Sequence, residues 1–417
     1  MPPRQSLIHQ QNLWKTFFVF LLPLIATNIL QNLSGTINTI FVGQMMGVDA
    51  IAAVSVYFPI LFLLLAFIIG ISTGTTILVG QAWGAQDIEK VQSVVGSTLF
   101  MTIIGGIITA IIGVFFAHDI LEILGTDPKV MHLSLPYVQW MLAGSPLLFV
   151  YIIYTSILRG VGDSTTPLLA LALTSVIGVI ITPILLKGYF GFPALGIIAP
   201  AIASIISYIA ILIFLAIYLN KKKHPLRPNR QLLQHIRHNP DLSKIILRLG
   251  VPTGIQMITT SMAGLVIVGL VNRFGAHATA AYGAVNQVLN YIQFPALSIS
   301  IAASIFAAQA IGAGKSDLLA RVTRTALGMN FLFTGTLIAL GYLFSKYLMA
   351  LFITDPTVVM LGQQLLFIEI PCAYWFSSMW GLKGIWFAYA LAFVSLCIVQ
   401  GLYYQFIWKK KKIKVLI

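Results

Sequence analysis

Long apolar segments separated by short polar stretches dominate this chain. Each segment is long enough to cross a hydrocarbon core of about 30 Å as a helix, and none alternates as barrel strands do. The pattern therefore predicts an all-α integral membrane fold. We expect spans near residues 15–46, 50–82, 91–117, 131–158, 164–187, 193–219, 249–274, 278–311, 318–349 and 384–408, with an ambiguous region at 357–379.

The composition supports this prediction. Hydrophobic residues make up 58% of the 417 residues, charged residues make up 9%, and the mean hydropathy is +0.93. A soluble protein could not bury so much apolar surface. Cys372 and Cys397 lie within apolar segments, where we interpret them as small packing residues. Residues 1–16 are polar, so we expect a cytoplasmic tail at the N-terminus and no cleavable signal.

The distribution of basic residues predicts the orientation. With a cytoplasmic N-terminus, 20 of the 25 Lys and Arg residues fall on the inner side, including eight in 221–248 and five in 409–414. This asymmetry follows the positive-inside rule. We therefore expect a multi-pass membrane protein with both termini in the cytoplasm. The net charge of +14 then reflects topology, so we expect no nucleic-acid partner.

An internal repeat divides the chain. "GQAWGA" at 80–85 aligns with "AQAIGA" at 308–313, and "ILGTDPKV" at 123–130 aligns with "LFITDPTV" at 351–358, both at an offset of about 228 residues. Two homologous halves of six helices follow from this repeat. We predict an N-terminal lobe at 1–220, a basic cytoplasmic linker at 221–248 and a C-terminal lobe at 249–417.

The second lobe is abbreviated at its helices 10 and 11. When Pro183 is aligned with Pro371, about forty residues that the first half holds are missing from the second. Residues 357–379 would then form a re-entrant hairpin with Glu369 at its turn. A natural deletion and a segment left out of the sequence both produce this pattern.

Four segments resemble the multidrug and toxic compound extrusion (MATE) family. They are "NTIFVGQMMG" at 38–47, "GQAWGAQD" at 80–87, "LRGVGDSTTPL" at 158–168 and "GLKGIWFAYALA" at 381–392. The resemblance implies a two-lobe antiporter that exports amphipathic, often cationic compounds in exchange for Na⁺ or H⁺. It implies small-molecule substrates, a lipid environment and a monomer, with no enzymatic activity, no cofactor besides the coupling ion and no resident metal.

The chain departs from the family pattern at its acidic positions. Family members commonly carry an Asp where this chain has Asn38, and many carry a Glu in helix 7, where only Gln256 is near that depth. Glu369 alone among the acidic residues lies well inside an apolar run. An intramembrane charge costs roughly 2.5–3.5 kcal/mol on insertion, so Glu369 is a functional candidate. A structural role at the outer rim and an artefact of the join are the alternatives.

Other polar groups within the spans could line a substrate or ion cavity, although hydrogen bonds between helices explain them equally well. In "LRGVGDSTTP", Asp163 with Ser164 and Thr165 is predicted to cap the next helix, and Arg159 to anchor or gate the inner turn. The cavity candidates are Asn28, Gln31, Asn38, Gln256, Asn286, Gln287, Asn290, Gln293 and Glu369.

Three other function classes are alternatives for this sequence. A membrane enzyme needs a reactive cluster, and the sequence shows neither a zinc-protease motif nor a nucleophile elbow. A flippase for a lipid-linked precursor would share the two-lobe plan but would be expected to carry several cations in its cavity. A remnant that no longer transports is the third alternative, because the abbreviated lobe could be disabled.

Overall fold

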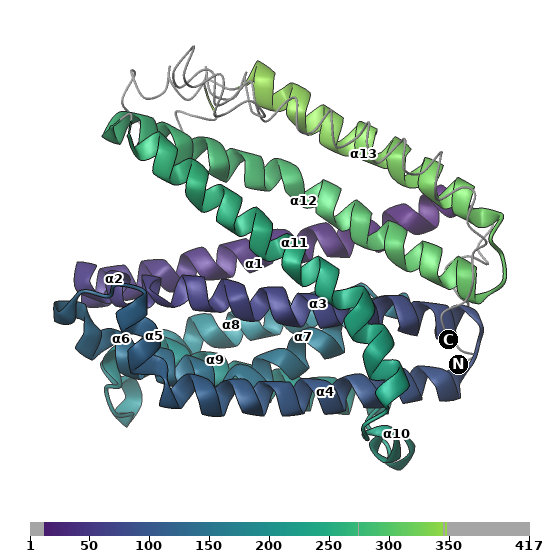
Figure 1. Ribbon diagram of the computed structural model, residues 1–417, viewed down its shortest axis with the longest axis horizontal. Helices are drawn as coiled ribbons and strands as arrows, with labels where there is room; N and C mark the ends of the chain where they lie inside the picture. The colour runs from purple at the N-terminus through teal and green to yellow at the C-terminus, as the bar shows by residue number, and fades with distance from the viewer. Residues whose placement is uncertain (1–11, 274, 345–346, 348–417) are drawn as a thin grey trace. The chain divides into compact units, whose positions relative to one another are not determined.

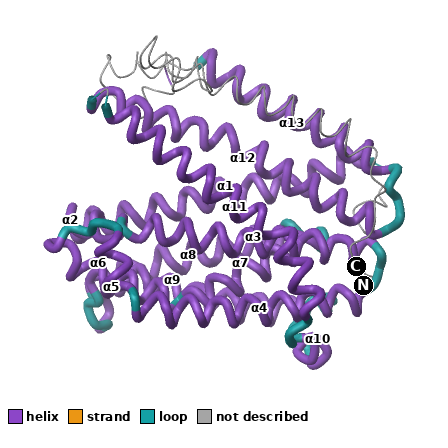
Figure 2. Tube along the Cα trace, in the orientation of Figure 1, coloured by secondary structure: helices purple, strands orange, loops and turns teal. Residues whose placement is uncertain are grey.

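The computed structural model describes residues 12–273, 275–344 and 347, and their regular structure is helical throughout (Figures 1 and 2). This confirms the predicted all-α class. Within these residues, six helices are long and apolar enough to cross a membrane, or seven if one bent pair forms a single span. The helices are α1 (Leu13–Met46), α2 (Val48–Ser55), α3 (Tyr57–Gly84), α4 (Ile88–Phe115), α5 (Ala117–Ile123), α6 (Pro128–Ala143), α7 (Ser145–Gly160), α8 (Thr165–Lys187), α9 (Ala199–Lys221), α10 (Arg230–His235), α11 (Pro240–Asn272), α12 (Ala276–Gly312) and α13 (Leu318–Leu343), with short 3₁₀ turns η2 (Tyr189–Gly191) and η3 (Gly196–Ile198).

One predicted span is bent at a break in the structure, and another is interrupted only by a turn. The span at 131–158 divides into α6 and α7, which meet at Gly144 with a bend of 47°. Pro146 stands in the first turn of α7, where its missing N–H removes no helical hydrogen bond. The predicted span at 50–82 corresponds to α2 and α3, which are separated by a turn at Val56 and together form one candidate span, Val48–Gly84. Apolar length alone predicted these spans, and it carries no information about such breaks.

Helices α1 to α9 pack as a bundle in which α7 holds a central position (Figure 1). It packs against α3, α4, α8 and α9. Its side chains Phe149, Ile153, Ile157 and Leu158 are fully buried. Beside them, α8 packs between α1 and α9. The polar turn after α7 is thereby fixed against several neighbouring helices.

Contacts divide the chain into two compact units. The first contains the described residues up to Ile258 together with Ile301–Val322, and the second contains the described residues of Thr259–Ser300 and of the segment from Thr323 onward. These units are defined by contacts and the predicted lobes by the repeat, so the boundaries at 220 and 249 stay a prediction. The join at 357–379, Glu369 and the span at 384–408 lie outside the described residues.

Candidate functional site

Helix α3 packs backbone to backbone against α11 through small residues. A methyl group on Gly70 would lie 2.7 Å from the carbonyl oxygen of Gly250, and one on Gly250 would lie 2.4 Å from the oxygen of Gly70. One turn further along α3, a methyl group on Gly74 would lie 2.5 Å from the oxygen of Ile246. Only glycine permits such an approach, and small residues four apart are typical of close helix crossings in membranes.

A second crossing joins α3 to α12 and is reciprocal. A methyl group on Gly84 would lie 2.1 Å from the carbonyl oxygen of Gln309, and one on Gly312 would lie 1.8 Å from the oxygen of Gln81. These two pairs exchange places under the internal repeat, because Gln81 aligns with Gln309 and Gly84 with Gly312. We call this contact the α3–α12 crossing. It lies within the first compact unit.

The α3–α12 crossing also engages the end of α7. The Nε2 of Gln309 donates a hydrogen bond to the carbonyl oxygen of Gly160 at 3.0 Å. Both glutamines are almost fully buried, at 3% for Gln81 and 0% for Gln309. A buried helix end needs partners for its last carbonyls, and Gln309 supplies one from another helix.

Arg159 stands beside this contact on α7. Its Nη2 donates to the Oγ of Ser156 at 2.6 Å, and the Oγ of Ser72 on α3 donates to the same oxygen at 2.6 Å. Arg159 thus reaches α3 through a shared hydroxyl, as an interface anchor would. These contacts agree with the anchoring role, and the gating role stays a prediction.

Asp163 caps α8 as predicted, but Ser164 and Thr165 do not cap it with their side chains. Its Oδ1 accepts hydrogen bonds from the backbone N–H of Thr165 at 3.1 Å and of Thr166 at 3.0 Å, and its Oδ2 accepts from the Thr166 hydroxyl at 2.6 Å. Ser164 makes no capping hydrogen bond with its side chain. The carboxylate therefore carries the cap alone.

Asn38 carries a buried oxygen that has no partner among the described residues. Its Oδ1 is one of four such side-chain atoms, and the Tyr57 hydroxyl is another. One turn before Asn38, Ser34 bonds Ser175 of α8, so this side of α1 faces α8. Tyr57 packs edge to face on Tyr137 at 5.9 Å. Leaving a buried oxygen without a hydrogen-bond partner costs free energy. The amide oxygen of Asn38 is therefore a candidate to accept a hydrogen bond from a bound molecule or to ligate a cation.

The remaining candidates fall into three groups. Gln31, Gln256, Asn290 and Gln293 are exposed, whereas Asn28, Asn286 and Gln287 are half-buried. Asn286 donates from its Nδ2 to the carbonyl of Tyr282 at 3.2 Å, one turn back on α12. Glu369 lies outside the described residues. Asn286, Asn290 and Gln293 belong to the second compact unit and Asn38 to the first, so their joint role stays a prediction.

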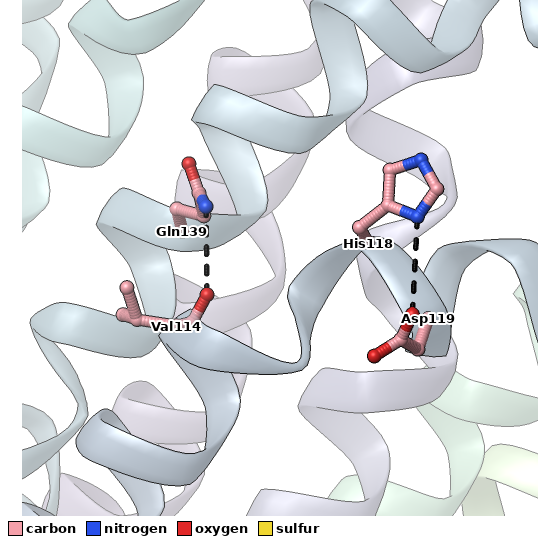
Figure 3. Close-up of polar contacts among 4 residues, drawn as sticks. All are labelled: Val114, His118, Asp119 and Gln139. Carbon is pink, nitrogen blue, oxygen red and sulfur yellow. Dashed lines mark hydrogen bonds and ion pairs between the residues drawn. The ribbon is translucent and has the colours of Figure 1, made fainter.

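One group of possible metal ligands occurs among the described residues, on the short helix α5. The donor atoms of His118, Asp119 and Glu122 lie within 4.8 Å of one another. Figure 3 shows the imidazole of His118 and the carboxylate of Asp119, 4.0 Å apart, near the hydrogen bond from Gln139 to the Val114 carbonyl that ties α6 to α4. All three possible ligands are exposed, and exposed acidic groups of this kind are common without an ion.

Comparison with known proteins places the whole chain in a family. The sequence model of MatE matches residues 23–184 and residues 252–396, one match in each predicted half. The chain belongs to the MatE family. It is 40% identical to the probable multidrug resistance protein YoeA of Bacillus subtilis (strain 168), over 97% of this chain and 96% of YoeA. It is 28% identical to the probable multidrug resistance protein YpnP of the same organism, over 86% of this chain and 78% of YpnP.

Solved structures have the same fold. The outward-facing conformation of a multidrug resistance MATE family transporter of the MOP superfamily aligns with a TM-score of 0.84 at 20% identity, covering 97% of each chain. A MATE structure in the bent conformation aligns with a TM-score of 0.83 at 21% identity, covering 94% of this chain and 95% of its own. This MatE chain is therefore a multi-pass membrane protein of a multidrug efflux transporter family.

The alignment with YoeA also bears on the abbreviated lobe. It runs over 447 positions, more than the 417 residues of this MatE chain. YoeA therefore has residues at positions where this chain has none. That agrees with the shortening inferred from the repeat, although its predicted location lies outside the described residues.

Sequence reasoning missed the helix crossings of this MatE protein. The signal was present as four pairs of small residues spaced by four: Gly70 and Gly74, Gly80 and Gly84, Gly250 and Gly254, and Ala308 and Gly312. Two of these pairs lie in the repeat segments "GQAWGA" and "AQAIGA". Spacing of this kind predicts a close crossing, but it does not say which helix lies opposite.

Proposed function

We propose that this protein is a secondary active antiporter of a bacterial inner membrane that exports amphipathic, often cationic compounds in exchange for Na⁺ or H⁺. The names of YoeA and YpnP, both probable multidrug resistance proteins, support a drug-like substrate. The many apolar helices support membrane localisation. As an antiporter, the protein would bind either the substrate or the coupling ions at one time. It would expose the bound species alternately to the two sides of the membrane.

The observation that carries this proposal is the α3–α12 crossing. Alternating access requires a contact that closes one side of the membrane and then separates. The crossing joins one helix from each half of the repeat and consists of backbone packed against glycine and alanine. Separating such a surface leaves few apolar side chains to repack, although it also exposes the buried amides of Gln81 and Gln309. With the predicted topology, it closes the cytoplasmic side.

Asn38 is our candidate for the first substrate or ion contact. Its amide oxygen can accept a hydrogen bond or ligate a hard cation such as Na⁺, but it cannot carry a proton at neutral pH. If H⁺ is the coupling ion, another group must therefore carry it. Glu369 is the candidate that the sequence offers for that role.

A reversible crosslink tests the proposal. The Cβ of residue 80, once added, would lie 2.9 Å from the Cβ of Ala308. Disulfide-linked Cβ atoms lie about 3.5–4.5 Å apart, so the two helices must move slightly apart for the bond to form. The variant carries Gly80→Cys and Ala308→Cys, with Cys372→Ser and Cys397→Ser to remove the native thiols. In cells that lack their own drug pumps, oxidant should abolish efflux of ethidium and reductant should restore it.

Controls make this test specific. Oxidant should not change the ethidium export of either single-cysteine variant, because neither can form the crosslink. This comparison of each variant with itself holds even where the added side chain lowers export. An export rate that stays unchanged after complete crosslinking would contradict the proposed role of the crossing. Absence of ethidium export, and of any change in drug resistance, in the cysteine-free parent would contradict the drug-export function itself.

A further inference from the structure

The linker between α9 and α11 is a folded element held against the first bundle. Leu226 and Leu232 are buried, at 1% and 2% exposure. The Tyr154 hydroxyl of α7 donates to the carbonyl oxygen of Leu226 at 2.6 Å. The Nε2 of Gln92 on α4 reaches the carbonyl of Pro225 at 3.5 Å. Two helices of the bundle thus fix the path of the linker.

Helix α10 within the linker is also fixed. The Oδ1 of Asn229 caps it by accepting from the N–H of Leu232 at 2.8 Å. A methyl group on Gly96 of α4 would lie 2.1 Å from the carbonyl oxygen of His235, so the two backbones touch. The ring of Phe100 on α4 contacts that of His238 with centroids 5.9 Å apart.

The exposed side of this element is basic. Residues 221–248 hold eight Lys and Arg residues and one acidic residue, Asp241. Among the described residues, none of these cations forms an ion pair. Lys222 instead lies over the ring of Tyr218, with its Nζ 4.3 Å from the centroid. The exposed cations are Lys221, Lys222, Lys223, Arg230, Arg237, Lys244 and Arg248.

Apolar side chains are exposed among these cations. Leu233 of α10 is 58% exposed and stands between Arg230 and Arg237 in the sequence. Leu247 of α11 is 39% exposed and adjoins Arg248. Mixed basic and apolar side chains are typical of surfaces that lie at a membrane interface.

We propose that this surface, residues 221–248, binds anionic phospholipid headgroups of the adjacent leaflet. The positive-inside rule accounts for the number of basic residues, but that rule acts during insertion and needs no folded linker. Here the linker is capped, buried on one side and tied to α4 and α7. Its cations are therefore held in place between α9, which is long and apolar enough to span a membrane, and α11. Fixed cations without acidic partners favour phosphate groups.

A lipid titration tests this inference on the full-length protein. Phosphatidylglycerol is added to the detergent-solubilised protein, and its apparent association constant is measured by native mass spectrometry, with phosphatidylcholine as the neutral reference. The triple variant Lys221→Gln, Lys222→Gln, Lys223→Gln should lower that constant about fivefold or more. The matched control Lys129→Gln, Lys187→Gln, Arg273→Gln removes three cations elsewhere and should keep the wild-type constant.

A second pair of variants tests the fixed geometry without changing any charge. Gly96→Ala should displace α10 and weaken phosphatidylglycerol binding, whereas Gly105→Ala on the same helix meets only the Phe67 ring at 3.7 Å and should not. The proposal would be overturned if the lysine variant bound phosphatidylglycerol as the wild type does, or if the control variant lost as much affinity. A preference of the protein for an RNA oligonucleotide over lipid would also overturn it. Wild-type binding in Gly96→Ala would overturn the need for a fixed linker.

Discussion

Gly312 of α12 lies against the carbonyl of Gln81 so closely that a single added methyl group would stand 1.8 Å from that oxygen. The repeat-related Gly84 makes the same approach to Gln309 at 2.1 Å. The two halves of this MatE protein therefore meet at this point by a reciprocal contact of equivalent residues. Its close fit is the basis of the first prediction.

Replacing Gly312 by Ala should destabilise the α3–α12 crossing. The added methyl group has no room, and overpacking of this kind typically costs about 1–3 kcal/mol. We expect a lower melting temperature of the purified protein and reduced drug efflux. Gly283→Ala on the same helix is the control, because nothing lies within 4 Å of its added methyl group. Equal melting temperatures and equal efflux of the two variants would contradict the close fit at Gly312.

Replacing Asp163 by Ala should weaken the start of α8. The variant loses the two backbone hydrogen bonds and the Thr166 hydroxyl bond that the carboxylate accepts. Loss of a cap typically costs about 1 kcal/mol. Thermal unfolding in detergent should show this loss, whereas Ser164→Ala should leave the melting temperature unchanged, because Ser164 makes no capping bond. A larger effect of Ser164→Ala would contradict this assignment.

Replacing Asn38 by Leu should separate function from stability. The Asn38 oxygen has no partner among the described residues, so its removal breaks no hydrogen bond there and should leave the melting temperature at or above that of the wild type. If the amide contacts substrate or ion, drug efflux should fall at equal expression. Normal efflux in this variant would remove Asn38 from the site. Asn290→Leu is the parallel test for α12.

The predicted topology can be tested by single-cysteine labelling. In a protein without native cysteines, Lys129→Cys should react with an impermeant maleimide added outside intact cells, whereas Lys223→Cys should react only after permeabilisation. Both side chains are exposed, so burial would not explain a difference. Strong labelling of residue 223 from outside would reverse the orientation inferred from charge.

Local patterns in the sequence were sufficient to predict most of the long helices. Predicted and observed spans begin and end within a few residues of one another for α1, α4, α8 and α12, because a helix in a membrane satisfies its own backbone and needs only a sufficient apolar length. The cap at Asp163 was equally predictable, since its partners stand two and three residues away. The repeat and the motifs identified the family, which the MatE match confirmed.

The contacts between helices could not be predicted from these local patterns. Gln309 donates a hydrogen bond to the carbonyl of Gly160, which lies 149 residues away in the sequence. Gly84 packs against Gln309, which belongs to a helix of the other half. The sequence shows the small residues but not which residues they contact. It likewise shows the basic residues of 221–248 but not the path of the linker that carries them. Hydropathy, capping and helix propensity act over a few residues, whereas close crossings depend on the shapes of two surfaces that come together only when the chain is folded.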